Sequence, residues 1–252
     1  MLSLRRASVG LLLGIFLLPC TVAGAAEPIR PPVPTGWIGL ERVDRPGRAP
    51  FNPSAVFERY LWKPDAPPPK VGETVTGASG KEAVWKTLTP NAKGEVEGRG
   101  LGLAYATLEA DAAQARIWLA EIRRIAVLYV NGIPVGGDVY GHGITKVPLK
   151  LREGTNHLLA AGFRGPGLIR LDYASERQPV GRWDTTLPEI VPGEHTGMTA
   201  GILLVNATEE TRDGLEVEGT ILVEREDGEA ARYRLHPRRP VVIPPLGSVK
   251  VS

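Results

Sequence analysis

The residues best suited to bind a ligand gather in one glycine-rich stretch, residues 136–143. Asp138, Tyr140 and His142 alternate there with glycines, and such a composition favours a loop. An aromatic ring can stack on a sugar while polar side chains hydrogen-bond the hydroxyls. Arg164, which ends a nearby apolar run, could join them. We therefore expect a sugar-binding site of these four residues; the alternative is an ordinary polar loop in which Tyr140 is half buried.

No comparable set of catalytic residues is present in the sequence. The chain has no G-x-S-x-G elbow and no H-E-x-x-H motif, and its four histidines lie far apart without ligand-like spacing. The glycines of residues 132–143 fit neither a phosphate loop nor a dinucleotide fingerprint. Asp184, Glu189 and Glu194 are separated by prolines and share no defined face, which argues against a carboxylate pair for sugar hydrolysis. We expect a chain that is not an enzyme and that uses no metal or cofactor.

Strands are expected to position this loop. Residues 125–130 are a compact β-branched and aromatic run that ends in Asn131-Gly132, a dipeptide that tolerates the positive φ angles of a type I′ hairpin turn. Residues 108–126 also place apolar side chains at helical spacing, so a helix is a legitimate alternative there. We favour strands for residues 116–121 and 125–130.

The segments around the loop resemble the galactose-binding-like jelly roll. The resemblance is carried by the W-x-x-L pattern that begins at Trp85, by the Y-V-N-G-x-x-V phrase of residues 129–135, and by L-x-x-G-x-N at Leu151, Gly154 and Asn156. The matches span roughly the middle 90 residues, a length typical of one β-sandwich. The resemblance implies an all-β module of the kind found beside the catalytic domains of extracellular hydrolases, where it binds sugars or packs against its neighbour.

Several signature residues have structural interpretations that come before any functional one. Asn156 is expected to hydrogen-bond local backbone where its strand begins, and Gly154 to supply a turn conformation that other residues adopt only with strain. Trp118 and Tyr129 are expected to lie on sheet faces, because strand aromatics usually fill cores. All of these residues are therefore assigned to the scaffold.

The tail of the chain, residues 178–252, is predicted to be a second and smaller β unit. Apolar or alternating runs at 197–206, 215–223, 230–235, 241–243 and 249–251 are separated by turn signals. Asp213-Gly214 and Asp227-Gly228 are the expected turns, and Pro244-Pro245-Leu246 the expected bend before the last strand. The pattern resembles an immunoglobulin-like sandwich. The two-module order is similar to the N-terminal portion of exported bacterial hydrolases of the α/β-hydrolase or prolyl-oligopeptidase type.

The beginning of the chain predicts export. Residues 1–25 combine two early arginines, an apolar run and the small-x-small pattern Ala23-Gly24-Ala25, as in a secretory signal peptide cleaved near Ala25. Cys20 raises a lipoprotein alternative, but Pro19 stands where a small residue is needed. The apolar run is shorter than the ~20 residues of a membrane span. We expect a secreted or periplasmic protein that begins near Ala26 and has no membrane span.

Composition excludes further classes. The 252 residues carry 30 Lys and Arg against 28 Asp and Glu. Without a clustered basic face, no nucleic-acid partner is expected, and Arg238-Arg239 is interpreted as a solvated loop. Cys20 is the one cysteine, so removal of the leader leaves nothing to form a disulfide and stability must come from a hydrophobic core.

The expected organisation has four parts: a signal peptide (1–25), a proline-rich lead-in (26–70) with no regular elements over 27–50, a jelly roll (71–177) and a small β-sandwich (178–252). The expected function is that of an exported non-catalytic carbohydrate-binding or accessory module associated with a hydrolase. The alternative is a structural domain pair that positions a catalytic domain or partner protein and binds no small ligand. An exposed aromatic platform in the loop would favour the first, and a large exposed apolar patch elsewhere the second.

Overall fold

The computed structural model describes residues 28–43, 56, 59–60, 67–174, 180–186, 201–215, 219–224, 230–235 and 241–251. Every element that it defines there is a β-strand, and the strand pairs are antiparallel. The all-β prediction is therefore confirmed, and the sheets are compatible with a β-sandwich. The predicted signal peptide lies outside the described residues.

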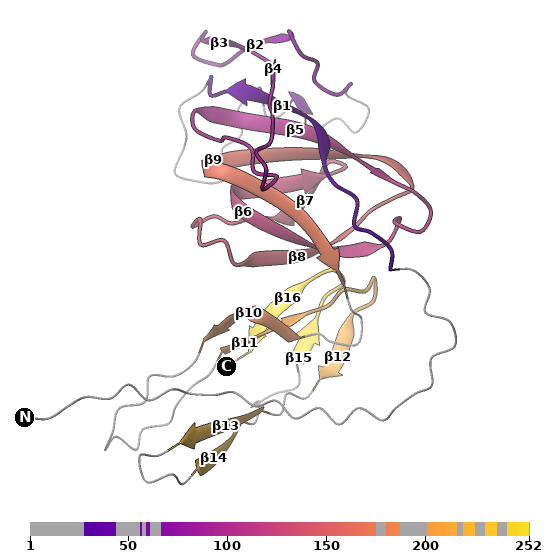
Figure 1. Cartoon of the computed structure of the whole chain (residues 1–252), viewed down its shortest axis with the longest axis vertical. Coiled ribbons are helices and arrows are strands. Elements are labelled where there is room, and N and C mark those ends of the chain that lie inside the picture. Colours follow the sequence, from indigo (N-terminus) through magenta and orange to yellow (C-terminus); the bar gives the residue numbers. More distant parts are fainter. Residues whose placement is uncertain are drawn as a thin grey trace, which may run out of the picture.

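The largest sheet has seven strands and carries the predicted binding loop (Figure 1). Its strands in chain order are β1 (Thr35–Glu41), β4 (Lys86–Thr87), β5 (Leu101–Ala110), β6 (Ile117–Val130), β7 (Ile133–Gly136), β8 (Thr145–Lys150) and β9 (Gly154–Tyr173). In space the order is β4-β1-β5-β9-β6-β7, and β8 pairs with β6. The short hairpin of β2 (Thr74–Thr76) and β3 (Glu82–Val84) lies beyond β1, at the top of Figure 1.

The two long strands β6 and β9 are interrupted at one point. Regular pairing stops after Arg123 and resumes at Ile125, so that Arg124 alone stands opposite residues 164–167 of β9. A bulge of this kind bends the strand that carries the extra residues, here β9, and can redirect a side chain. Before the bulge β6 pairs with β8, and after it β6 pairs with β7. The bulge thus marks the place where β6 exchanges one neighbour for another.

Two apolar clusters hold this sheet together. The larger includes Trp118 and Leu128 of β6 and Leu108 of β5, and the second includes Trp85 together with Tyr129. Adjacent residues Leu128 and Tyr129 belong to different clusters, as expected when both faces of a strand are covered. Full burial of each large apolar side chain contributes about 1.5–3 kcal/mol. The scaffold interpretation of Trp118 and Tyr129 is confirmed, since they are 0% and 8% exposed.

The prediction that residues 27–50 form no regular elements is wrong for Thr35–Glu41, which form β1. This stretch has no proline, and its side chains at Trp37, Ile38 and Leu40 are buried. It lies between β4 and β5 in the sheet. Gly39 lets this strand pack closely, because a methyl group there would lie 2.7 Å from Cδ1 of Leu88 and would force a neighbouring leucine side chain to shift. The prolines on either side of this stretch therefore limit the length of the strand but do not prevent it from forming.

The helical alternative for residues 108–126 is also wrong. β5 continues to Ala110, a turn follows, and β6 begins at Ile117. In the turn the Asp111 carboxylate accepts a hydrogen bond from the backbone N–H of Gln114 at 2.8 Å. The Trp118 indole donates to the Gln114 carbonyl at 2.9 Å, which fixes the start of β6. The favoured strand assignment is confirmed.

The predicted hairpin turn between β6 and β7 is confirmed. Asn131 and Gly132 have φ angles of 52° and 80°, and Val130 pairs with Ile133. Asn156 is fully buried and supports the same region. Its Oδ1 accepts from the Asn131 amide at 2.9 Å, and its Nδ2 donates to the carbonyl oxygens of Leu108, Arg152 and Gly154. The local backbone role expected for Asn156 is confirmed.

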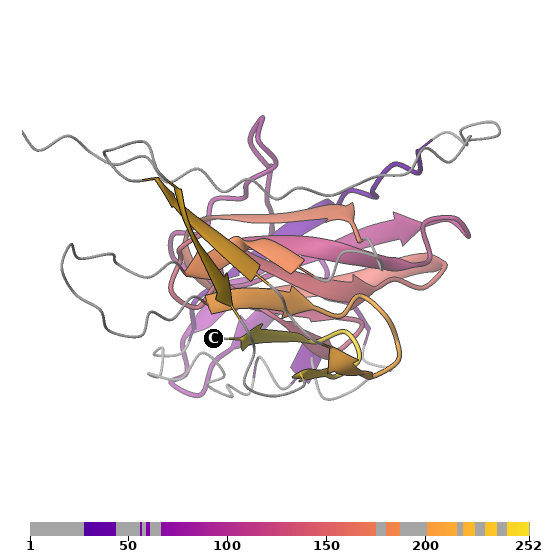
Figure 2. The ribbon, with the colours of Figure 1, turned by 90° about the horizontal axis from the view of Figure 1, so that it is seen from below.

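The remaining strands form smaller sheets at the lower end of Figure 1. They are β10 (Val180–Thr186), β11 (Gly201–Val205), β12 (Arg212–Leu215), β13 (Gly219–Glu224), β14 (Ala230–Leu235), β15 (Val241–Ile243) and β16 (Ser248–Val251). The pairings are β10-β11-β16, β12-β15 and β13-β14. Seen from below, these strands lie in front of the larger sheet (Figure 2). Lys150 of β8 contacts both carboxylate oxygens of Glu209 at 2.7 Å and so joins the two groups of strands.

The turn after β11 lies at residues 206–211, not at Asp213-Gly214. Asn206 is buried there, and its Nδ2 donates to the carbonyl oxygens of Glu210, Ile243 and Pro244. The predicted turn at Asp213-Gly214 is wrong: Gly214 has a φ of 66° inside β12, where the pairing with β15 shifts register. Asp227-Gly228 lies outside the described residues, in the connection between the paired strands β13 and β14.

Candidate functional site

One buried carboxylate anchors the loop of residues 136–143. Asp138 is 3% exposed, and its Oδ1 accepts from the backbone N–H of His142 at 2.9 Å. Its Oδ2 accepts from the backbone N–H groups of Arg124 at 2.8 Å and Gly143 at 2.9 Å. The Asp138 N–H in turn donates to the Ile125 carbonyl at 2.7 Å. The carboxylate therefore ties the loop to the bulge of β6.

Tyr140 projects from this anchored loop into solvent. Its side chain is 82% exposed, so the alternative of a half-buried tyrosine is wrong. The His142 ring lies beside it, with ring centroids 5.9 Å apart and planes inclined by 44°. An aromatic face on a held backbone suits stacking on a sugar ring, because the apolar surface is presented with little loss of conformational entropy.

Two arginines lie along glycine backbone next to the loop. A methyl group at Gly141 would lie 3.7 Å from Cδ of Arg164, and one at Gly165 would lie 3.6 Å from Cδ of Arg124. Both glycines have positive φ angles, 72° and 131°, which glycine adopts without strain. Both arginines are exposed. The predicted site residues Tyr140, His142 and Arg164 are thus brought together, with Asp138 beneath them.

The arginines of this region differ in their ionic partners. Glu121 is 3% exposed and pairs with Arg123 through Oε1 and with Arg170 through Oε2. A buried carboxylate shared by two guanidinium groups is well compensated. Arg124 and Arg164, by contrast, form no ion pair with any residue that the structure describes. Among the described residues, no carboxylate neutralises either guanidinium group.

A cavity of about 300 Å³ adjoins the loop. Its polar lining comes from Tyr140, His142, Thr145, Lys146, Asp184 and Ser248. The first four belong to the loop and β8, and the last two to β10 and β16. The volume is at the lower end of the range for small-ligand sites. The loop therefore overhangs a hollow that both groups of strands help to form.

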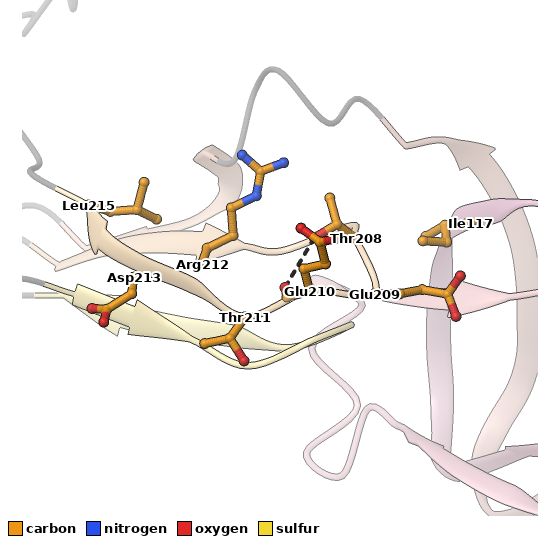
Figure 3. A pocket seen from close by; sticks show the side chains of 8 residues that line it. All are labelled: Ile117, Thr208, Glu209, Glu210, Thr211, Arg212, Asp213 and Leu215. Carbon is orange, nitrogen blue, oxygen red and sulfur yellow. Dashed lines mark hydrogen bonds between the residues drawn. The ribbon is translucent and has the colours of Figure 1, made fainter.

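A second cavity, of about 720 Å³, is lined mainly by residues 208–213 and is drawn in Figure 3. Arg212 points to one side of the strand, while Thr211 and Asp213 point to the other. Thr208 donates to the Glu210 carbonyl at 3.2 Å, and the Glu209 carboxylate is bound to Lys150. Because the charged groups diverge or are already paired, this cavity offers no convergent set of binding groups.

Tyr105, which is buried, and His157, which is half-buried, form a hydrogen-bonded pair of titratable groups on the sheet. The Tyr105 hydroxyl lies 2.6 Å from His157 Nδ1. Burial raises the pKa of Tyr105 to about 12, and burial, assisted by the charge of Arg152, lowers the pKa of His157. Near neutral pH the hydroxyl therefore keeps its proton and the imidazole is neutral, and the direction of the hydrogen bond between them depends on the tautomer of His157. The pair stabilises the sheet in its uncharged form.

Sequence reasoning missed the contribution of β6 to the site. Apart from Glu121, the other residues of β6 are apolar, and the consecutive exposed residues Arg123 and Arg124 break the alternation expected of a regular strand. That break was a usable signal for a bulge.

The sequence Asn206-Ala207-Thr208 also matches the Asn-x-Thr pattern of glycosylation acceptors, which the sequence reasoning missed. Asn206 is 2% exposed, and its amide group donates hydrogen bonds to three carbonyl oxygens, so it is no glycosylation acceptor in this fold.

The described residues form neither a cluster of metal ligands nor a membrane-spanning helix. Within the described ranges, no three His, Cys, Asp or Glu side chains come together as metal ligands. No helix in the described part of the chain has the length and hydrophobicity needed to cross a bilayer.

No protein-family model matches the chain, and no curated protein matches it.

Proposed function

We propose that the chain is an exported, non-catalytic module that binds a glycan through the loop of residues 136–143. The observation that carries the proposal is the 82% exposure of Tyr140 on a loop held by the buried Asp138. Shallow sugar sites gain much of their favourable contact from an exposed aromatic face. His142 and Arg164 beside it supply hydrogen-bonding groups for hydroxyls.

The proposal includes a finer description of the fold. The seven-stranded sheet, with its Asn131-Gly132 turn and buried Asn156, supports a galactose-binding-like jelly roll, and the strands from β10 onward an immunoglobulin-like sandwich. The absence of a nucleophile elbow in the sequence supports a non-catalytic role. Export, with cleavage near Ala25, follows from the charged and apolar leader.

Calorimetric titration with a panel of oligosaccharides tests the binding proposal. The wild-type chain is expected to bind at least one member, and Tyr140→Ala to weaken binding by about 1 kcal/mol or more while leaving thermal stability nearly unchanged. Tyr140→Phe is the matched control, because it keeps the stacking face and removes the hydroxyl. Binding that persists in Tyr140→Ala would place the site elsewhere.

A structural domain pair that positions a hydrolase domain or partner protein is the second candidate. The Lys150–Glu209 contact supports it, since both carboxylate oxygens lie 2.7 Å from the ammonium group and link the two groups of strands. A large exposed apolar patch would add support; the exposed large apolar side chains of the described residues come from separate segments of the sequence. If no oligosaccharide binds, this second function replaces the first.

A further inference from the structure

We propose that the glycan held by this loop carries carboxylate or sulfate groups, and that Arg124 and Arg164 bind them. The inference rests on the proposed function and names the ligand class for the same site. It follows from three observations: two exposed arginines that form no ion pair with a described residue, a strained backbone that presents one of them, and an exposed aromatic ring next to the other.

The pairing pattern separates these two arginines from the cations beside them on the sheet. Around them, Arg123 and Arg170 share the carboxylate of Glu121, and Lys146 lies 2.6 Å from Asp172. Each of these cations is opposed by a carboxylate of the sheet. Arg124 and Arg164 have no such carboxylate among the described residues. The oxygens of Asp138 are engaged by backbone N–H groups, so they do not serve as the missing partner.

The backbone at Arg124 is held in a conformation that its side chain disfavours. Its φ is 54°, a region that residues other than glycine rarely adopt, and the Asp138 carboxylate stabilises it by accepting the Arg124 N–H. Glycine would relieve this strain. Strained conformations that are fixed by surrounding contacts concentrate at functional sites. An arginine in this strained conformation therefore points to a use for its guanidinium group.

The ligand class follows from the chemistry of the groups presented. A guanidinium group binds carboxylate or sulfate oxygens through two parallel hydrogen bonds, which gives both charge and geometry. Arg164 lies along Gly141, the chain neighbour of Tyr140, so the cation and the aromatic face are adjacent. A saccharide stacked on Tyr140 would thus bring acidic substituents toward Arg164 and, across the bulge, toward Arg124.

The experiment compares neutral, uronate-bearing and sulfated glycans on one array, followed by calorimetry with a hexamer of galacturonic acid and with its neutral methyl ester. The variants are Arg124→Gly, which removes the guanidinium and relieves the backbone strain, and Arg164→Gln. Arg30→Gln is the matched control: Arg30 is exposed, and its carbonyl binds Gln114, before the start of β6 at Ile117. The seven residues from Ile117 to Arg124 span roughly 23 Å of strand, so Arg30 lies far from Arg124.

We expect the chain to bind only the acidic glycans. The affinity should fall by at least about tenfold in Arg124→Gly and in Arg164→Gln, and should be unchanged in Arg30→Gln. Binding should also weaken as salt is raised. Equal binding of neutral glycans through Tyr140 would overturn this inference and leave the proposed function standing. Equal loss in all three variants would show non-specific charge attraction and overturn it as well. Failure of every glycan to bind would overturn both.

Discussion

Replacing Asp138 with alanine should unfold the loop from the sheet and destabilise the whole chain. Three backbone N–H groups lose their acceptor: those of Arg124, His142 and Gly143. The N–H of Arg124 lies in the bulge between two strands, and leaving it unpaired costs about 1–3 kcal/mol. The N–H groups of His142 and Gly143 lie in the loop and can form hydrogen bonds to water instead, so the loss of each bond to Asp138 costs about 1 kcal/mol. The expected decrease in the free energy of unfolding is about 3–5 kcal/mol.

Asp138→Asn should destabilise the chain less than Asp138→Ala does. Its one carbonyl oxygen can replace Oδ2 and keep the bonds from Arg124 and Gly143, while its amide faces the N–H of His142 and loses that bond. The expected decrease in unfolding free energy is about 1–2 kcal/mol. Tyr140→Ala, at an 82% exposed position on the same loop, should change it by less than about 0.5 kcal/mol.

Urea unfolding followed by circular dichroism measures all three variants, with equal m-values required so that midpoints can be compared. The expected order of stability is wild type, then Asp138→Asn, then Asp138→Ala. A value for Asp138→Ala within 0.5 kcal/mol of wild type, a margin typical of surface substitutions, would refute the assignment of Asp138 as the anchor of the loop.

Asn156→Ala should lower the unfolding free energy by about 3–4 kcal/mol in urea titrations, since it leaves buried carbonyl and N–H groups without partners. Gly39→Ala should cost about 1–3 kcal/mol through the clash with neighbouring leucines, and a neutral result would argue against β1 in the sheet. The raised pKa of Tyr105 implies stability that is complete below pH ~10 and lost toward pH 12, so Tyr105→Phe should flatten that decline in unfolding midpoints. The lowered pKa of His157 implies the opposite dependence, with stability lost as pH falls below ~6.5. Mass spectrometry of exported protein should give an unmodified amino terminus near Ala26, and a diacylated Cys20 would contradict this.

Local signals predicted much of the fold because their physical basis is local. The positive φ angles of Asn131 and Gly132 are a property of those two residues, and the hairpin follows from them. Alternation predicted β14, and flanking proline and glycine predicted β15, at the bounds that the structure shows. The strand at Thr35–Glu41 was missed because its stability comes from distant partners: β4 and β5 supply its hydrogen bonds, and the cluster around Trp85 covers Ile38 and Leu40.

The site was only partly predictable for a similar reason. Exposure of Tyr140 depends on the loop path, and that path is set by bonds between Asp138 and a residue fourteen positions earlier, Arg124. A sequence scan can recognise the polar groups between glycines but cannot tell which of them faces inward. The structure separates them, with the carboxylate buried and the aromatic ring in solvent.

The bulge explains why binding groups gather at this place in an otherwise well-packed sheet. A regular strand would direct alternate side chains into the two apolar clusters and leave no room for adjacent cations. At the bulge, Arg124 and Arg164 escape this alternation, and Gly165 of β9 and Gly141 of the loop let their stems lie along the backbone. The same interruption exposes the N–H of Arg124, which Asp138 binds, and that bond brings Tyr140 alongside. One irregularity in the pairing of β6 with β9 thus places the cations, anchors the loop and orients the aromatic ring, so a change that restores regular pairing should remove all three together.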